Sequence, residues 1–180
     1  TASAATATPT ALGTVYGLPC TSTSLGNTGI GFGALAAVNT SAACNVAVGT
    51  LALNANTSGC YNVAIGSNAL LLTTTGIQNT AIGNRAGCAI TTGSYNVILG
   101  GNTGVGIATA TCNIIISDGA GNNRIQVDGN GNVGVGTGSP TFNLQVNGSF
   151  AATTKSFVIN HPTKPGAMLR YASLEGPEHG

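Results

Sequence analysis

A five-residue motif, Asn-x-Ala/Gly-Ile/Val-Gly, returns along this chain at a nearly constant interval. Its copies open at Asn27, Asn45, Asn62, Asn79, Asn96 and Asn113. The first interval is 18 residues and each later interval is 17 residues. A short, fixed period of this kind is typical of stacked coils, in which each unit is stable only when its neighbours cover it.

Within the motif, large and small residues alternate. The third position after the Asn is large and aliphatic: Ile30, Val48, Ile65, Ile82, Leu99 and Ile116. The position before it is mostly small: Gly29, Ala47, Ala64, Ala81, Ile98 and Ile115. The motif ends at Gly31, Gly49, Gly66, Gly83 and Gly100, and at Ser117 in the last copy. Large, mostly β-branched residues that alternate with small ones and are followed by a glycine predict one short strand per coil.

The rest of each coil predicts corners. A second small column comes seven residues after the Asn, at Ala34, Ala52, Ala69, Ala86, Thr103 and Ala120, and indicates a second short strand or a corner. Gly59, Gly76 and Gly93 share another column, where a tight corner needs a positive φ or a missing Cβ. We therefore predict an all-β protein, a parallel β-solenoid about 24 Å long with strands ~4.8 Å apart. The Asn column should form a hydrogen-bonded ladder along it.

The composition indicates that the stability of the coils comes from more than one chain. Charged residues make up 5% of the 180 residues, against about 25% in ordinary globular proteins. With four Phe, four Tyr and no Trp, a thin coil encloses little apolar area. We therefore expect an intertwined parallel homotrimer whose small Ala/Gly faces pack around a common axis. In this arrangement the Ile column is buried in the stack, and the Ile82→Asp substitution should disrupt assembly.

Four regions are expected. Residues 1–24 form an extended lead-in with a strand near 14–16, and residues 25–117 form the solenoid repeats. A β-hairpin connector follows at 118–154, with turns at 118–123 and 128–132 and a third hairpin signal at Asn147-Gly148. Residues 155–180 are expected to open a C-terminal module.

Charge and hydropathy exclude two classes of partner. The net charge is +1, and the basic residues are scattered at Arg85, Arg124, Lys155, Lys164 and Arg170. Phosphate binding needs clustered basic side chains, so no nucleic-acid partner is expected. No apolar run approaches the ~20 residues of a membrane span, so no membrane insertion is expected. Because the chain lacks an initiator Met and a signal sequence, we expect it to be a segment of a longer protein.

The five cysteines follow the repeat rather than a metal-site spacing. They are Cys20, Cys44, Cys60, Cys88 and Cys112. Cys44 and Cys112 share the column before the Asn with Tyr61 and Tyr95. This placement favours buried thiols that serve as small apolar side chains. A disulfide is the alternative. No Cys-x-x-Cys occurs and His161 and His179 lie far away in sequence, so neither a metal nor a cofactor is expected.

The acidic residues do not indicate an enzyme. They are Asp118, Asp128, Glu175 and Glu178, whereas glycan hydrolysis needs two carboxylates facing across a cleft. The two aspartates are interpreted as turn formers, and the two glutamates as structural residues of one loop. The series Asp128, Asn130 and Asn132 imitates the start of a calcium loop, but it lacks the required Gly and Glu further on.

Three stretches of the chain resemble surface fibres. Coils such as Asn62-Val-Ala-Ile-Gly-Ser-Asn-Ala-Leu resemble the repeats of trimeric autotransporter adhesin heads, which have shorter coils. Two features are more similar to bacteriophage tail fibres. One is the longer period, and the other is the stretch from Asp128 to Pro140 with Leu144-Gln-Val-Asn-Gly after it. A last motif resembles the opening of a C-terminal module of cyanophage-like fibres and comprises His161, Pro162, Leu174, Glu175, Gly176, Pro177 and Glu178.

The resemblance implies a structural and adhesive role in a virion, as a tail fibre or a similar appendage. The expected partners are sister chains of a homotrimer, other virion or tail proteins, and a host cell-surface receptor, which includes the case of a glycan. Three alternatives stay open: a bacterial trimeric adhesin on the cell surface, an internal virion connector, and a glycan-depolymerising tailspike.

Overall fold

The computed structural model describes residues 26–38, 41–151, 156–160 and 168–172, the last two ranges as backbone only. The described residues divide into two units, one ending at Asn147 and one beginning at Gly148. The predicted strand near residues 14–16 and the motif at 161–162 and 174–178 lie outside the described residues.

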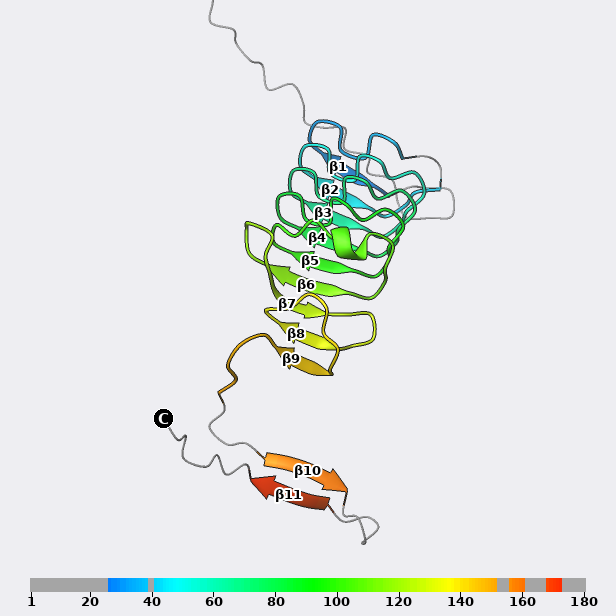
Figure 1. Ribbon diagram of the computed structural model, residues 1–180. Helices are drawn as coiled ribbons and strands as arrows, with labels where there is room; N and C mark the ends of the chain where they lie inside the picture. The colour runs from blue at the N-terminus through cyan, green and yellow to red at the C-terminus, as the bar shows by residue number, and fades with distance from the viewer. Residues whose placement is uncertain (1–25, 39–40, 152–155, 161–167, 173–180) are drawn as a thin grey trace, which may run out of the picture. The chain divides into compact units, whose positions relative to one another are not determined.

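The first unit is a β-solenoid with one short strand per coil, as the motif spacing predicts. Its strands are β1 (Thr28–Ile30), β2 (Val46–Val48), β3 (Val63–Ile65), β4 (Thr80–Ile82), β5 (Val97–Leu99) and β6 (Ile114–Ser117). Each pairs in parallel with the next, in a register that keeps equivalent motif positions side by side. In Figure 1 these strands follow one another along one side of the coil.

Backbone hydrogen bonds also join successive coils at their corners. Leu53 N donates to Ala69 O at 3.0 Å, and Thr74 N donates to Thr91 O at 2.8 Å. The second small column therefore forms a corner and not a strand. Several sides of each coil therefore bond to the next coil through the backbone, which pairs many of the backbone polar groups.

The sheet continues beyond the coils into a region of different topology. Strand β7 (Asn123–Val127) pairs antiparallel with β6, and β8 (Val133–Val135) pairs antiparallel with β7. The first two hairpin signals therefore correspond to antiparallel pairs. The third prediction is wrong, because β9 (Leu144–Val146) pairs in parallel with β8 and residues 149–151 form no strand. The result is one nine-stranded sheet, ordered β1 to β9.

The core lies inside the coils and is built from small strand residues and larger corner residues. Ala47, Ala64 and Ala81 are fully buried within a single chain. Opposite them the corners supply Leu53 and Leu70, which are also fully buried. The expectation that the small faces pack between chains is therefore wrong. The coil is so narrow that, once corner leucines enter it, only small strand residues fit.

In the later coils the small residues lie at the corner position and the large residues lie on the strand. Gly87 and Gly104 take the corner position that is leucine in the first coils, while Ile98 and Ile115 replace the strand alanines. A Cβ at Gly87 would lie 3.2 Å from Cδ1 of Ile98. Large and small residues therefore change places between the strand wall and the corner wall, and Gly87 leaves room for Ile98 of the following strand.

The second unit contains a two-stranded antiparallel sheet formed by β10 (Ser156–Asn160) and β11 (Met168–Ala172). A single 3-10 helix, Val105–Ile107, interrupts the described β structure of the first unit.

Candidate functional site

The six motif asparagines form a continuous buried ladder. The Oδ1 of Asn45 accepts hydrogen bonds from the backbone N of Asn62 at 2.9 Å and from its Nδ2 at 3.1 Å. The Nδ2 of Asn62 also donates to the Gly76 carbonyl at 2.9 Å. The same pattern links Asn27 to Asn45 and continues through Asn79, Asn96 and Asn113. These residues hold the coils together and face no solvent, so the ladder is structural.

The glycines of the repeat meet two different steric requirements. Gly31, Gly49, Gly66, Gly83 and Gly100 have φ between +102° and +138°, a region that L-residues avoid. Gly59, Gly76 and Gly93 show no such φ; there an added Cβ would overlap a carbonyl oxygen of the next coil. Of the two explanations left open for this column, the missing Cβ is the correct one.

The large column of the motif lies on the outside of the coil. Ile82 is 42% exposed, whereas its neighbour Ala81 is fully buried. The expectation that the Ile column is buried within the stack of a single chain is therefore wrong. Because successive strand residues point to opposite faces, the burial of the small column places the large column outside.

Two parallel rows of side chains, which we call the outer rows, run along this exposed face. The first row is Thr28, Val46, Val63, Thr80, Val97, Ile114, Val127, Val133 and Leu144. The second row is Ile30, Val48, Ile65, Ile82, Leu99, Ile116, Ile125, Val135 and Val146. Only the two threonines are not aliphatic, and no charged residue belongs to either row. Across nine strands the rows extend roughly 38 Å.

Sequence reasoning missed the full length of this face. The period of 17 residues ends at β6, but register pairs Ile116 with Ile125 and Ile125 with Val135, so the outer rows continue through the antiparallel strands. A usable signal was present in the alternation of Val133-Gly-Val and Leu144-Gln-Val.

Asp118 and Asp128 organise two turns of the same design, as predicted. Oδ1 of Asp118 accepts hydrogen bonds from the backbone N of Ala120 and of Asn122, each at 3.0 Å. Oδ1 of Asp128 accepts from Asn130 N and Asn132 N, each at 2.9 Å. Hydrogen bonds from Asn122, and the adjacent Arg124 guanidinium, hold the pKa of Asp118 well below its ordinary value. The pKa of Asp128 is also lowered, chiefly by the backbone hydrogen bond from Asn132.

The cysteines differ from the buried-thiol interpretation. Cys88 is a buried free thiol, but Cys112 is exposed and Cys60 is partly exposed. Cys44 is disulfide-bonded, and Cys20 lies outside the described residues. The column before the Asn has a left-handed backbone, with φ of +57° at Cys44 and +60° at Cys112. It holds the exposed Tyr61 and Tyr95 as well, so it is a surface corner and not part of the core.

In the part of the chain that the structure describes, no three His, Cys, Asp or Glu side chains are grouped as a metal site would require. The same part contains no helix long and apolar enough to cross a membrane. No protein-family model, no curated protein and no solved structure matches this chain.

Proposed function

We propose that this chain is the shaft of a homotrimeric fibre, a structural and adhesive appendage of a virion that presents a surface to a host cell. The observation that carries the proposal is the pair of outer rows. Monomeric soluble proteins rarely leave a long, continuous apolar strip in water. The second outer row is aliphatic on all nine strands and neither row carries a charge, which favours a permanent apolar interface.

Sister copies of the same chain are the partners that this face fits best. A covering partner must present aliphatic side chains at the spacing of the coils and over the same length. A parallel copy does so, because each coil then meets its own equivalent. Two rows allow each chain to contact two neighbours, and head-to-tail contacts of this kind can close into a ring; we propose a ring of three.

The resemblance of the repeats and of the stretch from Asp128 to Pro140 to bacteriophage tail fibres supports the virion as the location. In this role the stacked backbone hydrogen bonds and the apolar interface make a stiff rod. Its polar flanks, rich in Thr, Asn and Gly, are left to meet a receptor such as a host glycan. Other virion or tail proteins would hold the rod in place.

The Ile82→Asp substitution tests the assembly. Because Ile82 is 42% exposed in the isolated chain, the coil should still fold, while a carboxylate in a covered interface lacks a partner and costs several kcal/mol. We expect sedimentation analysis to show a trimer for the wild type and a folded monomer for the variant.

The matched control is Thr75→Asp, which adds the same charge at an exposed corner outside the outer rows and should stay trimeric. A wild-type chain that is monomeric at micromolar concentration would refute the trimer, and a wild-type dimer would refute the ring of three. The adhesive role is tested separately by binding of the labelled trimer to candidate host cells, where absence of binding to every host tested would count against it.

A further inference from the structure

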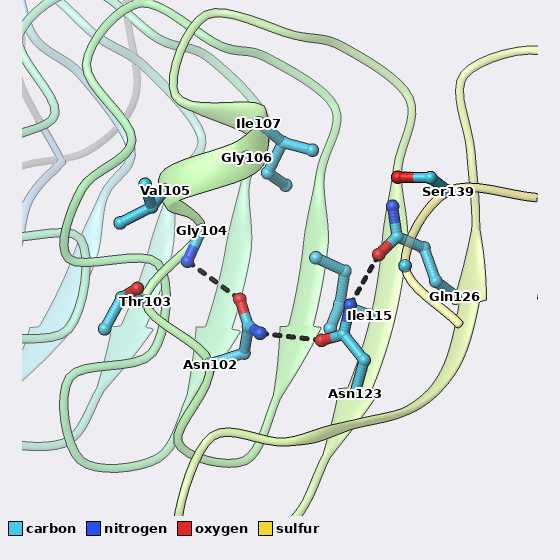
Figure 2. A pocket seen from close by; sticks show the side chains of 11 residues that line it. Asn102, Thr103, Gly104, Val105, Gly106, Ile107, Ile115, Asn123, Gln126 and Ser139 are labelled. Atoms are coloured by element: carbon cyan, nitrogen blue, oxygen red, sulfur yellow. Dashed lines mark hydrogen bonds between the residues drawn. The ribbon is translucent and has the colours of Figure 1, made fainter. Parts of the chain in front are cut away.

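A pocket of about 210 Å³ lies at the end of the solenoid interior. It forms where β6 is followed by the antiparallel strand β7 rather than by another coil. Its lining includes Asn102, Ile107, Ile115, Asn123, Gln126 and Ser139 (Figure 2). No charged side chain lines it.

A chain of hydrogen bonds orients the three amides of this pocket. The backbone N of Gly104 donates to Oδ1 of Asn102 at 2.8 Å, so Nδ2 of Asn102 faces the other way and donates to Oδ1 of Asn123 at 2.6 Å. Nδ2 of Asn123 in turn donates to Oε1 of Gln126 at 2.7 Å. Since a backbone N–H can only donate, it sets the direction of every bond in the series.

The series ends on an unused donor. Gln126 is only 5% exposed, and its Nε2 donates to no group in the described part of the chain. No side-chain nitrogen or oxygen among the described residues is both buried and unpaired, so this nitrogen is accessible to solvent, and Gln126 lines the pocket. Figure 2 shows it directed away from Asn123. A nearly buried amide whose donor is met only by water favours a ligand that offers an acceptor in place of that water.

The surroundings of this donor narrow the class of ligand. Ile107 and Ile115 form an apolar wall, and the absence of charge favours a neutral molecule. The volume is below the roughly 300–1,000 Å³ of pockets for drug-sized ligands, which suits one sugar ring or a substituent of it. An acetamido group fits both features, because its carbonyl oxygen accepts from Gln126 Nε2 while its methyl group contacts the isoleucines.

We propose that this pocket binds an N-acetylated hexosamine of a surface glycan through its acetamido group. The choice of a glycan rests on the adhesive role proposed above. Ile115 and Gln126 are register partners that point into the coil, whereas Ile114 and Val127 beside them belong to the outer rows. The pocket is thus on the opposite side of the sheet from the proposed trimer interface and stays open after assembly.

The test is an NMR titration of the full 180-residue chain with N-acetylglucosamine and with glucose. We expect N-acetylglucosamine to shift the side-chain amide resonances of Gln126, and glucose to bind about tenfold more weakly or worse because it lacks the acceptor and the methyl group. Equal binding of the two sugars, or no shift at all because the pocket holds only water, would overturn the proposal.

Two variants keep the test specific. Gln126→Glu retains an oxygen for Asn123 but replaces the free donor by an acceptor, so binding should be lost. Gly106→Val adds a side chain at a residue that lines the pocket and whose added Cβ meets nothing within 4 Å, so the chain should fold and sugar binding should fall. A melting temperature close to that of the wild type verifies folding, and unchanged sugar binding in folded Gly106→Val would contradict the assignment.

The two proposals fail separately. If the wild type binds host cells and Gln126→Glu binds them equally well, the pocket is not the adhesive site, although adhesion itself stands. If the wild type binds N-acetylglucosamine but no cell, the pocket stands and the adhesive role is refuted.

Discussion

At the scale of the residue, the motif asparagine uses its whole hydrogen-bonding capacity. In Asn79 the Oδ1 accepts from Asn96 N and Asn96 Nδ2, while Nδ2 donates to Asn62 Oδ1 and to the Gly93 carbonyl. No other side chain of this size carries both an acceptor with two lone pairs and two donors on one planar group. This explains why the first motif position is Asn in every copy.

The Asn79→Ala substitution should therefore cost about 3 kcal/mol or more in the free energy of unfolding. It leaves the Asn96 N–H and the Gly93 carbonyl buried without partners, at ~1–3 kcal/mol each. Chemical denaturation of the variant against the wild type measures the loss. The control is Asn130→Ala in an exposed turn, which should change stability by less than about 0.5 kcal/mol; an equally small effect at Asn79 would refute the role of the ladder.

The aspartate turns predict a response to acid. The pKa of Asp118 is lowered on folding from its ordinary value of 3.8, so its contribution to stability is present above that pH and is lost as the pH falls through the lowered folded value. Since the side chain is at the surface, the effect should be local. We expect the Asn122 amide resonance, followed by NMR, to titrate in this acidic range.

In Asp118→Asn the Asn122 resonance should stay constant as the pH is lowered, because no carboxylate remains to be protonated. Asp128, whose pKa is also lowered, should titrate as before in that variant. A wild-type Asn122 resonance that titrates at or above the ordinary aspartate pKa would contradict the proposed hydrogen-bonded carboxylate.

At the scale of the element, each strand from β1 to β5 is followed by a glycine that the stacking requires. Gly66 has φ of +136°, and a Cβ there would lie 2.6 Å from the carbonyl carbon of Gly83 in the next coil. Two penalties coincide, the backbone conformation and the overlap with a neighbouring backbone that cannot move alone. The glycine column is therefore set by the distance between coils as much as by the turn.

Gly66→Ala should accordingly destabilise the solenoid by about 3 kcal/mol or more. Gly106→Ala is the matched control, because its added Cβ meets nothing within 4 Å and its φ is not positive; its effect should stay within about 1 kcal/mol. Thermal unfolding followed by circular dichroism compares the two. Equal melting temperatures for both variants would show that the coils can separate to accept a methyl group.

Sequence reasoning located these elements but missed part of their backbone conformation. The alternation within the motif predicted β1 to β6 correctly, and the Asp-Gly turns indicated β7 and β8. Left-handed conformations at Leu53, Leu70 and Tyr61 carry no signal in the sequence, because these residue types avoid positive φ. They are imposed by the hydrogen bonds that tie every corner to the coil beside it.

At the scale of the whole molecule, the outer rows decide how the chain exists in solution. If sister chains cover them, folding and assembly are linked, and the melting temperature rises with protein concentration. We expect this dependence for the wild type and for Thr75→Asp, but not for Ile82→Asp, whose melting temperature should be lower and independent of concentration. Calorimetry over a range of protein concentrations measures it, and a constant wild-type melting temperature would contradict linked assembly.

The repeat period, the strand positions and the asparagine ladder could all be read from the order of residues, since each depends on chemistry local to one coil and its neighbour. Which face of each strand points into the coil could not be read from the order of residues. A period of two describes both faces of a strand equally well, and the interior is chosen by what the distant corners place inside it. Here Leu53 and Leu70 fill a narrow coil, so the alanines face inward and the isoleucines outward. The pocket at Gln126 likewise exists only because the chain reverses after β6 and leaves the last coil open.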